Sequence, residues 1–162
     1  MKNKKYELLK DDAITSFGQT LYRIKATTDF GDVEKGELGG YIEKEENLSH
    51  LGNAWVSGYA RVYGNARVYG NAWVSDNAWV SGEAEISGNA RVSSSKDYIV
   101  FKNHWSSGRH FTYTKSNKMW KVGCFYGTGA ELIAKAYKDS EASGKHYESY
   151  VNLVLELEKI DG

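Results

Sequence analysis

The chain has 162 residues, 41% of them apolar, which is enough to bury a core in one ordinary domain or two small ones. Its 21 Lys and Arg residues balance its 21 Asp and Glu residues, so the charge disfavours nucleic acid or an anionic membrane as a partner. The single cysteine, Cys124, excludes an intrachain disulfide framework, and no apolar run approaches the length of a membrane span. We therefore expect a cytoplasmic protein.

Residues 1–38 are not repetitive and precede a repeated segment. Alternating apolar residues from Tyr6 to Leu9 and from Leu21 to Ala26 predict two strands there. A stack of repeats exposes apolar interior and unpaired strand edges at its end, so we expect residues 1–38 to form an N-terminal β cap.

Seven six-residue repeats follow between Gly52 and Ser93 without insertion or deletion: GNAWVS, GYARVY, GNARVY, GNAWVS, DNAWVS, GEAEIS and GNARVS. Each has Ala at its third position and Val or Ile at its fifth. Because strand side chains alternate between faces, these two residues should point inward and the residue between them outward. The Gly or Asp that opens each repeat permits a corner. The pattern predicts a parallel β-helix with three repeats, or 18 residues, in each coil.

An 18-residue period makes a testable register. It aligns Trp55 with Trp73 and then Arg91, Arg61 with Trp79, and Arg67 with Glu85, which gives an aromatic stack, cation–π contacts and an ion pair. Extrapolated backwards, Ile42 and Leu48 fall in the Ala column and His50 falls in the Val column. The predicted β-helix then spans residues 39–95, with about three coils.

Residues 96–162 differ in character and predict a small β-β-β-α-α module. The three strand-like runs are 98–101, 109–114 and 119–125, and on this alternation Cys124 should be a buried apolar residue. Thr128 and Glu131 match a capping box at the start of a first helix. A second helix is predicted from about Lys145 to Lys159.

The repeat resembles the hexapeptide-repeat family, whose solenoid is a left-handed parallel β-helix. The segment from Asp29 to Val56, with its GG-Y-IE…NLS…GN core, resembles the N-terminal part of bacterial and prophage members that are labelled putative acetyltransferases. The segment from Gly123 to Glu131 resembles the C-terminal part of phage-encoded proteins of unknown role. The resemblance implies a left-handed coil, a phage-type protein and, as one alternative, an acyltransferase that uses acyl-CoA.

Catalysis is the weaker prediction. The acyltransferases of this family use a histidine base and hold acyl-CoA along stacked coils, whereas the repeats here contain no histidine and give only about 14 Å of stack. We expect His50 to be a cap residue bonded to backbone, and one cysteine with scattered histidines lacks the ligands for a zinc site. No catalytic residue, cofactor or metal is predicted.

The outward positions instead favour binding, because Trp, Tyr and Arg dominate protein interfaces. The predicted binding residues are Trp55, Trp73, Trp79, Arg61, Arg67, Arg91, Tyr59, Tyr63 and Tyr69. Two other interpretations are that these side chains contact only each other in solvent, or that the C-terminal module covers one face. The sequence thus predicts a non-enzymatic phage-type accessory protein that binds a host or viral protein in the host cytoplasm, for example to inhibit a host defence system. The remaining alternative is a self-assembling structural protein, a dimer or trimer.

Overall fold

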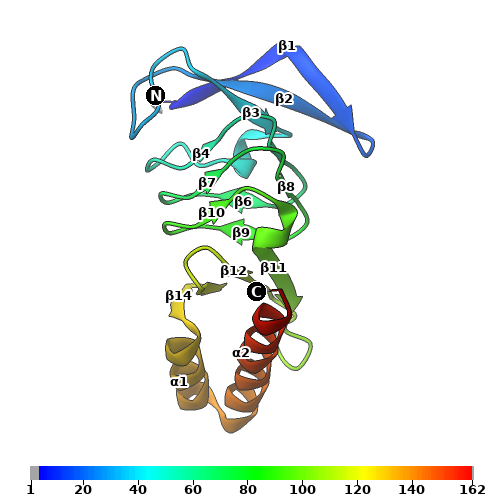
Figure 1. The fold of residues 1–162 in the computed structure, drawn as a ribbon, viewed down its shortest axis with the longest axis vertical. Coiled ribbons are helices and arrows are strands. Elements are labelled where there is room, and N and C mark those ends of the chain that lie inside the picture. The colour runs from blue at the N-terminus through cyan, green and yellow to red at the C-terminus, as the bar shows by residue number, and fades with distance from the viewer. Residues whose placement is uncertain (1–3, 162) are drawn as a thin grey trace.

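A computed structural model describes residues 4–161 of the chain (Figure 1). The protein is mainly β, with a stack of very short strands between an N-terminal hairpin and a C-terminal sheet that carries two helices. The strands are β1 (Tyr6–Ser16), β2 (Gln19–Ala26), β3 (Leu38–Ile42), β4 (Trp55–Val56), β5 (Arg61–Val62), β6 (Arg67–Val68), β7 (Trp73–Val74), β8 (Trp79–Val80), β9 (Glu85–Ile86), β10 (Arg91–Val92), β11 (Tyr98–Lys102), β12 (His110–Thr114), β13 (Met119–Val122) and β14 (Phe125–Thr128). The helices are α1 (Gly129–Asp139) and α2 (Glu141–Asp161), with 3-10 turns η1 (Glu45–Asn47) and η2 (Ser95–Asp97).

The two-residue strands form three parallel ladders that the chain visits in rotation. The ladders are β3-β5-β8, β6-β9 and β4-β7-β10, and consecutive strands always belong to different ladders. The predicted 18-residue register is confirmed at every aligned position: Trp73 pairs with Trp55 on one side and Arg91 on the other, Arg61 pairs with Trp79, and Arg67 pairs with Glu85. This arrangement is that of a β-solenoid repeat.

The interior of the stack consists of the two predicted columns. Every Ala and every Val or Ile of the seven repeats is at most 1% exposed, so these side chains do point inward. Ala leaves room beside each corner and the branched residue fills the middle of each side, which lets successive layers pack at the strand spacing of about 4.8 Å. Burial of these small side chains, multiplied over the layers, supplies the stabilising free energy of this part of the chain.

The first layer departs from the predicted period. Ile42 pairs with Val62 and Leu48 with Val68, a separation of 20 residues in each case. The prediction that Ile42 and Leu48 occupy the Ala column, with His50 in the Val column, is therefore wrong. The corner between Leu48 and β4 is two residues longer than the others, and it leaves Leu51 at its tip 81% exposed.

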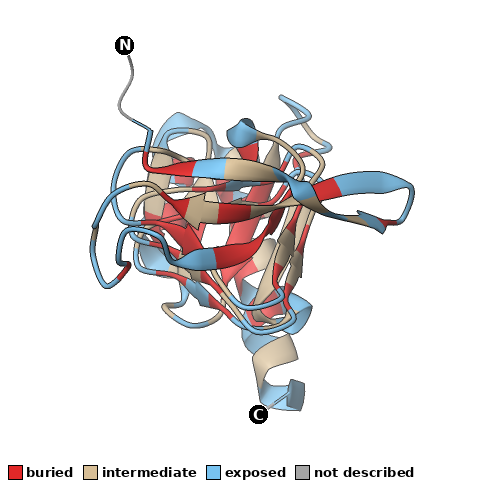
Figure 2. Ribbon diagram, turned by 90° about the horizontal axis from the view of Figure 1, so that it is seen from above, coloured by how far each residue is buried: buried red, intermediate tan, exposed pale blue. Residues whose placement is uncertain are grey.

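Both ends of the stack leave backbone groups without a strand partner, and side chains of the flanking segments satisfy several of them. At the upper edge, free carbonyls accept hydrogen bonds: Lys5 Nζ donates to the oxygens of Gly52 and Ala54, and the Tyr6 hydroxyl donates to that of Leu48. Figure 2 shows the β1–β2 hairpin crossing this end, with its exposed tip projecting beyond the stacked strands. Burial lowers the pKa of Lys5 to about 8.

At the lower edge, residues 98–116 provide partners for both free N–H groups and a free carbonyl. The N–H of Glu85 donates to the Thr112 hydroxyl, and that of Arg91 donates to the Ser116 hydroxyl. The Tyr98 hydroxyl donates to the carbonyl of Trp79. Hydroxyl side chains thus replace the next layer of strands and satisfy the backbone at this edge.

The C-terminal sheet has four antiparallel strands in the order β11-β12-β13-β14, with α1 and α2 packed on it. The prediction of three strands is wrong, because the run 119–125 turns back on itself at Gly123, whose φ is 55°. Cys124 lies in this turn and is exposed, so its predicted burial is also wrong. The Thr128–Glu131 capping box is confirmed, and α2 begins earlier than predicted, at Glu141. Within residues 4–161 no helix is both long and apolar enough to cross a membrane.

Candidate binding surfaces

The nine predicted binding residues do not form one surface. Their outward positions are divided among the three sides of the stack and its corners: Arg61 and Trp79 lie on the β3-β5-β8 side, Arg67 lies on the β6-β9 side, and Trp55, Trp73 and Arg91 lie on the β4-β7-β10 side. Tyr59, Tyr63 and Tyr69 lie at the corners between these sides. An 18-residue period keeps aligned residues together and separates neighbouring repeats, so each side must be assessed by itself.

On the β4-β7-β10 side, the prediction that Trp55 faces solvent is wrong. Trp55 is fully buried, because residues before β3 fold over it: its ring packs edge-on against Phe30 at a centroid distance of 5.3 Å and against Tyr6 at 6.4 Å. Trp73, one layer below, is half-buried, and its Nε1 donates to the Ser57 hydroxyl at 3.1 Å. Trp55 and Trp73 are aligned, but Trp55 packs against the N-terminal segment instead.

The β3-β5-β8 side carries a ladder of cations and aromatic rings. Arg61 lies over the ring of Trp79, with its Cζ 5.3 Å from the ring centroid, which confirms the predicted cation–π pair. Its Nη1 also donates to the Ser16 hydroxyl at 2.9 Å. The tip of the β1–β2 hairpin reaches down to the same place, where Phe17 packs edge-on against Trp79 at 4.7 Å. We call Phe17, Arg61 and Trp79 the hairpin patch.

Phe17 is the unusual member of the hairpin patch. It occupies the two-residue turn between Ser16 and Gln19 with φ of 51°, followed by Gly18 at 78°, and it is 69% exposed. Such turns favour Gly, which has no β-carbon to approach the backbone at positive φ, and Asn or Asp, whose short polar side chains can hydrogen-bond locally. Sequence reasoning missed Phe17. The available signal was the dipeptide Phe-Gly between two strand-like runs, where Asn-Gly would be ordinary.

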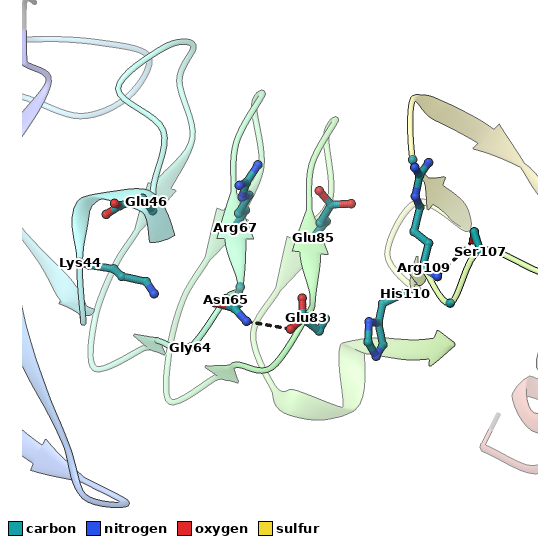
Figure 3. A pocket seen from close by; sticks show the side chains of 13 residues that line it. Lys44, Glu46, Gly64, Asn65, Arg67, Glu83, Glu85, Ser107, Arg109 and His110 are labelled. Carbon is teal, nitrogen blue, oxygen red and sulfur yellow. Dashed lines mark hydrogen bonds between the residues drawn. The ribbon is translucent and has the colours of Figure 1, made fainter. Parts of the chain in front are cut away.

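The β6-β9 side is hollowed into a groove between η1 (left in Figure 3) and the loops of the C-terminal sheet (right in Figure 3). Two adjoining cavities of about 650 and 1210 Å³ share Glu46, Arg67 and Glu85. Arg67 and Glu85 project from adjacent layers, and Arg109 lies beyond them on the loop before β12. We call this surface the groove.

Charged side chains line the groove, but few of them pair with one another. Glu83 accepts from the Asn65 amide at 2.8 Å, whereas Arg67 and Glu85, both within the described residues, form no ion pair, so the predicted pair is wrong. Tyr69, at one corner, is half-buried. Burial is the larger cause that raises its pKa, and the nearby charge of Glu85 is the smaller.

His50 lies beside the first layer of the stack and has a structural role. Its Nδ1 accepts from the backbone N–H of Lys5 at 3.1 Å, which confirms the predicted backbone bond, and its Nε2 lies 2.8 Å from Glu45. The ring also stacks on Tyr6 at 4.1 Å. Both ring nitrogens are therefore engaged. In residues 4–161 no three His, Cys, Asp or Glu side chains are grouped to hold a metal ion.

Comparison with known proteins supports the repeat. A family model described as the YdcK Beta solenoid repeat matches residues 60–76. These residues run from the inward Ala60 to Asp76 and include β5, β6 and β7, so the matched segment is part of the stack itself. No curated protein matches the chain. The repeat is thus similar to a known β-solenoid repeat.

Proposed function

We propose that the protein is a non-enzymatic scaffold that binds a protein partner through the hairpin patch. The observation that supports this most is Phe17, a large apolar side chain held at positive φ and left mostly exposed. Asn or Gly in this turn would relieve strain of about 1 kcal/mol, which offsets what the edge-on contact of Phe17 with Trp79 contributes, and would expose less apolar surface. A partner that covers Phe17 would give the residue a function.

The composition of the patch suits a protein interface. Aromatic residues and Arg are enriched among residues that dominate binding energy. Trp79 is half-buried and Arg61 is fixed by its contact with Ser16, so both side chains lose little conformational entropy when a partner binds. A stack with an interior of small, fully buried side chains provides a rigid support for them.

The finer features of this scaffold also belong to the proposal. We expect a left-handed β-helix of about three coils whose first 38 residues act as a cap. The resemblance to phage and prophage proteins makes a host or viral protein the expected partner, and inhibition of a host defence system is its concrete form. The protein would then act in the host cytoplasm.

Substitution of Phe17 tests the proposal, because it separates binding from folding. The variant Phe17→Asn should keep the melting temperature, since the strain that Asn relieves offsets the lost contact with Trp79, but should lose the proteins that wild-type protein captures from a bacterial lysate. Leu51→Ala is the matched control: it removes another exposed apolar side chain at a distant corner, and capture should persist. Equal capture by wild-type protein and Phe17→Asn would disprove the role of the hairpin patch.

A further inference from the structure

The groove lies on a different side of the stack from the hairpin patch and carries a separate pattern of charge. Descending the stack, the outward residues are Arg67, then Glu85, then Arg109 on the loop that leads into β12. The N–H of Glu85 donates to Thr112, which places β12 below β9, and Arg109 lines the same cavity as Glu85. The charges therefore alternate positive, negative, positive along the stack, with the backbones of Arg67 and Glu85 on adjacent strands about 5 Å apart.

These three side chains are available to a ligand. Within residues 4–161 none of them takes part in an ion pair, although charged residues at the rim do pair: Lys4 and His50 both contact Glu45. Arg67 and Glu85 are register partners on adjacent strands, yet their charged groups remain apart. A ligand with the opposite sequence of charges would contact all three without first breaking an existing ion pair.

We infer that the groove binds an extended peptide whose side chains facing the groove run acidic, basic, acidic. In an extended chain, side chains two residues apart point the same way and lie about 7 Å from each other. Three such side chains therefore span about 13 Å, and long, exposed side chains such as those of Arg67 and Arg109 can adjust to reach them. The acidic groups contact Arg67 and Arg109, and the basic group contacts Glu85.

The charge pattern argues against simpler ligands. A nucleic acid or a wholly acidic peptide would place an anion against Glu85 and the nearby Glu83, and a wholly basic peptide would place a cation against Arg67. Like charges brought together in a partly desolvated groove cost binding energy, so they discriminate against these ligands. The adjoining cavities, about 650 and 1210 Å³, are large enough for several residues of an extended chain.

Fluorescence anisotropy with two synthetic peptides tests the inference on the full chain. The first peptide is Gly-Asp-Gly-Lys-Gly-Asp-Gly and the second, its charge inverse, is Gly-Lys-Gly-Asp-Gly-Lys-Gly. Wild-type protein should bind the first at least about tenfold more tightly, and added salt should weaken binding because the contacts are ionic. Equal binding of the two peptides, or binding of neither, would overturn the inference.

Substitutions of groove residues test whether the peptide binds in the groove. Glu85→Lys should abolish the preference for the first peptide, and Arg91→Glu, on another side of the stack, should leave it unchanged. If Glu85→Lys does not fold, Arg67→Gln and Arg109→Gln, both at exposed positions, should each weaken the first peptide by about tenfold. Unchanged affinity in the folded groove variants would refute the assignment. Loss in Arg91→Glu as well would refute it too, because it would indicate nonspecific attraction.

Discussion

Trp55 and Trp73 occupy the same position in two copies of the same repeat, GNAWVS, and yet should respond very differently to substitution. Trp55 is fully buried beneath the N-terminal segment, and replacing a buried Trp by Ala leaves a cavity and costs about 3–5 kcal/mol. Trp73 is half-buried and donates one hydrogen bond to Ser57. We expect Trp73→Ala to cost about 1–2 kcal/mol, from that bond and part of the ring's burial.

Urea denaturation of the two variants gives the measurement. Each free energy of unfolding is extrapolated to water, and unchanged slopes would show that both variants still unfold in a single cooperative step. The Nε1 of Trp55 has no hydrogen-bond partner among the described residues, so Trp55→Phe should cost less than Trp55→Ala. If Trp55→Ala and Trp73→Ala cost the same within about 0.5 kcal/mol, the N-terminal segment does not cover Trp55 as described.

The remaining predictions concern a close backbone approach at Gly39 and the ionisation of buried Lys and Tyr residues. A β-carbon at Gly39 would lie 2.5 Å from the carbonyl oxygen of Val56, so Gly39→Ala should lower the melting temperature by several degrees in a thermal scan, and an unchanged value would contradict this close approach. Burial of Lys5 lowers its folded-state pKa to about 8, so stability should rise with pH from 8 to the unfolded-state value near 10.5, and Lys5→Met should remove that rise. Burial raises the pKa of Tyr6 and of Tyr113, so their contribution is complete below pH 10 and is lost at higher pH, where only the unfolded chain ionises. Chemical denaturation across this range, with tyrosinate absorbance as a second probe, should show the maximum near pH 10; a steady fall from pH 8 would contradict the sign for Lys5.

Patterns among residues close together in the sequence were enough to predict several elements of the fold. Alternation placed the inward columns, the capping box placed the start of α1 at Thr128, and Phe-Gly marked a turn that the prediction overlooked. The exposed position of Cys124 was missed because a strand-like run of seven residues can also fold as two short strands around a turn. In the sequence only Gly123 indicated that turn, and in the structure it has the positive φ that Gly readily adopts.

The candidate surfaces depended on contacts between residues far apart in the sequence. Nothing near Trp55 indicates that Phe30 and Tyr6 bury it, because the covering residues lie in a segment with no repeat. Likewise the hairpin patch exists only because the tip that carries Phe17 reaches β8, and the groove exists only because the loop with Arg109 lies below β9.

The sequence by itself determined the 18-residue register and the inward columns of Ala and Val, since a period of six combined with alternation admits few other arrangements. The tertiary structure alone decided which outward side chains remain accessible. The physical reason is that identical repeats create identical outward positions, and only the chain that packs over them, at either end, makes one Trp part of the core and leaves another at the surface.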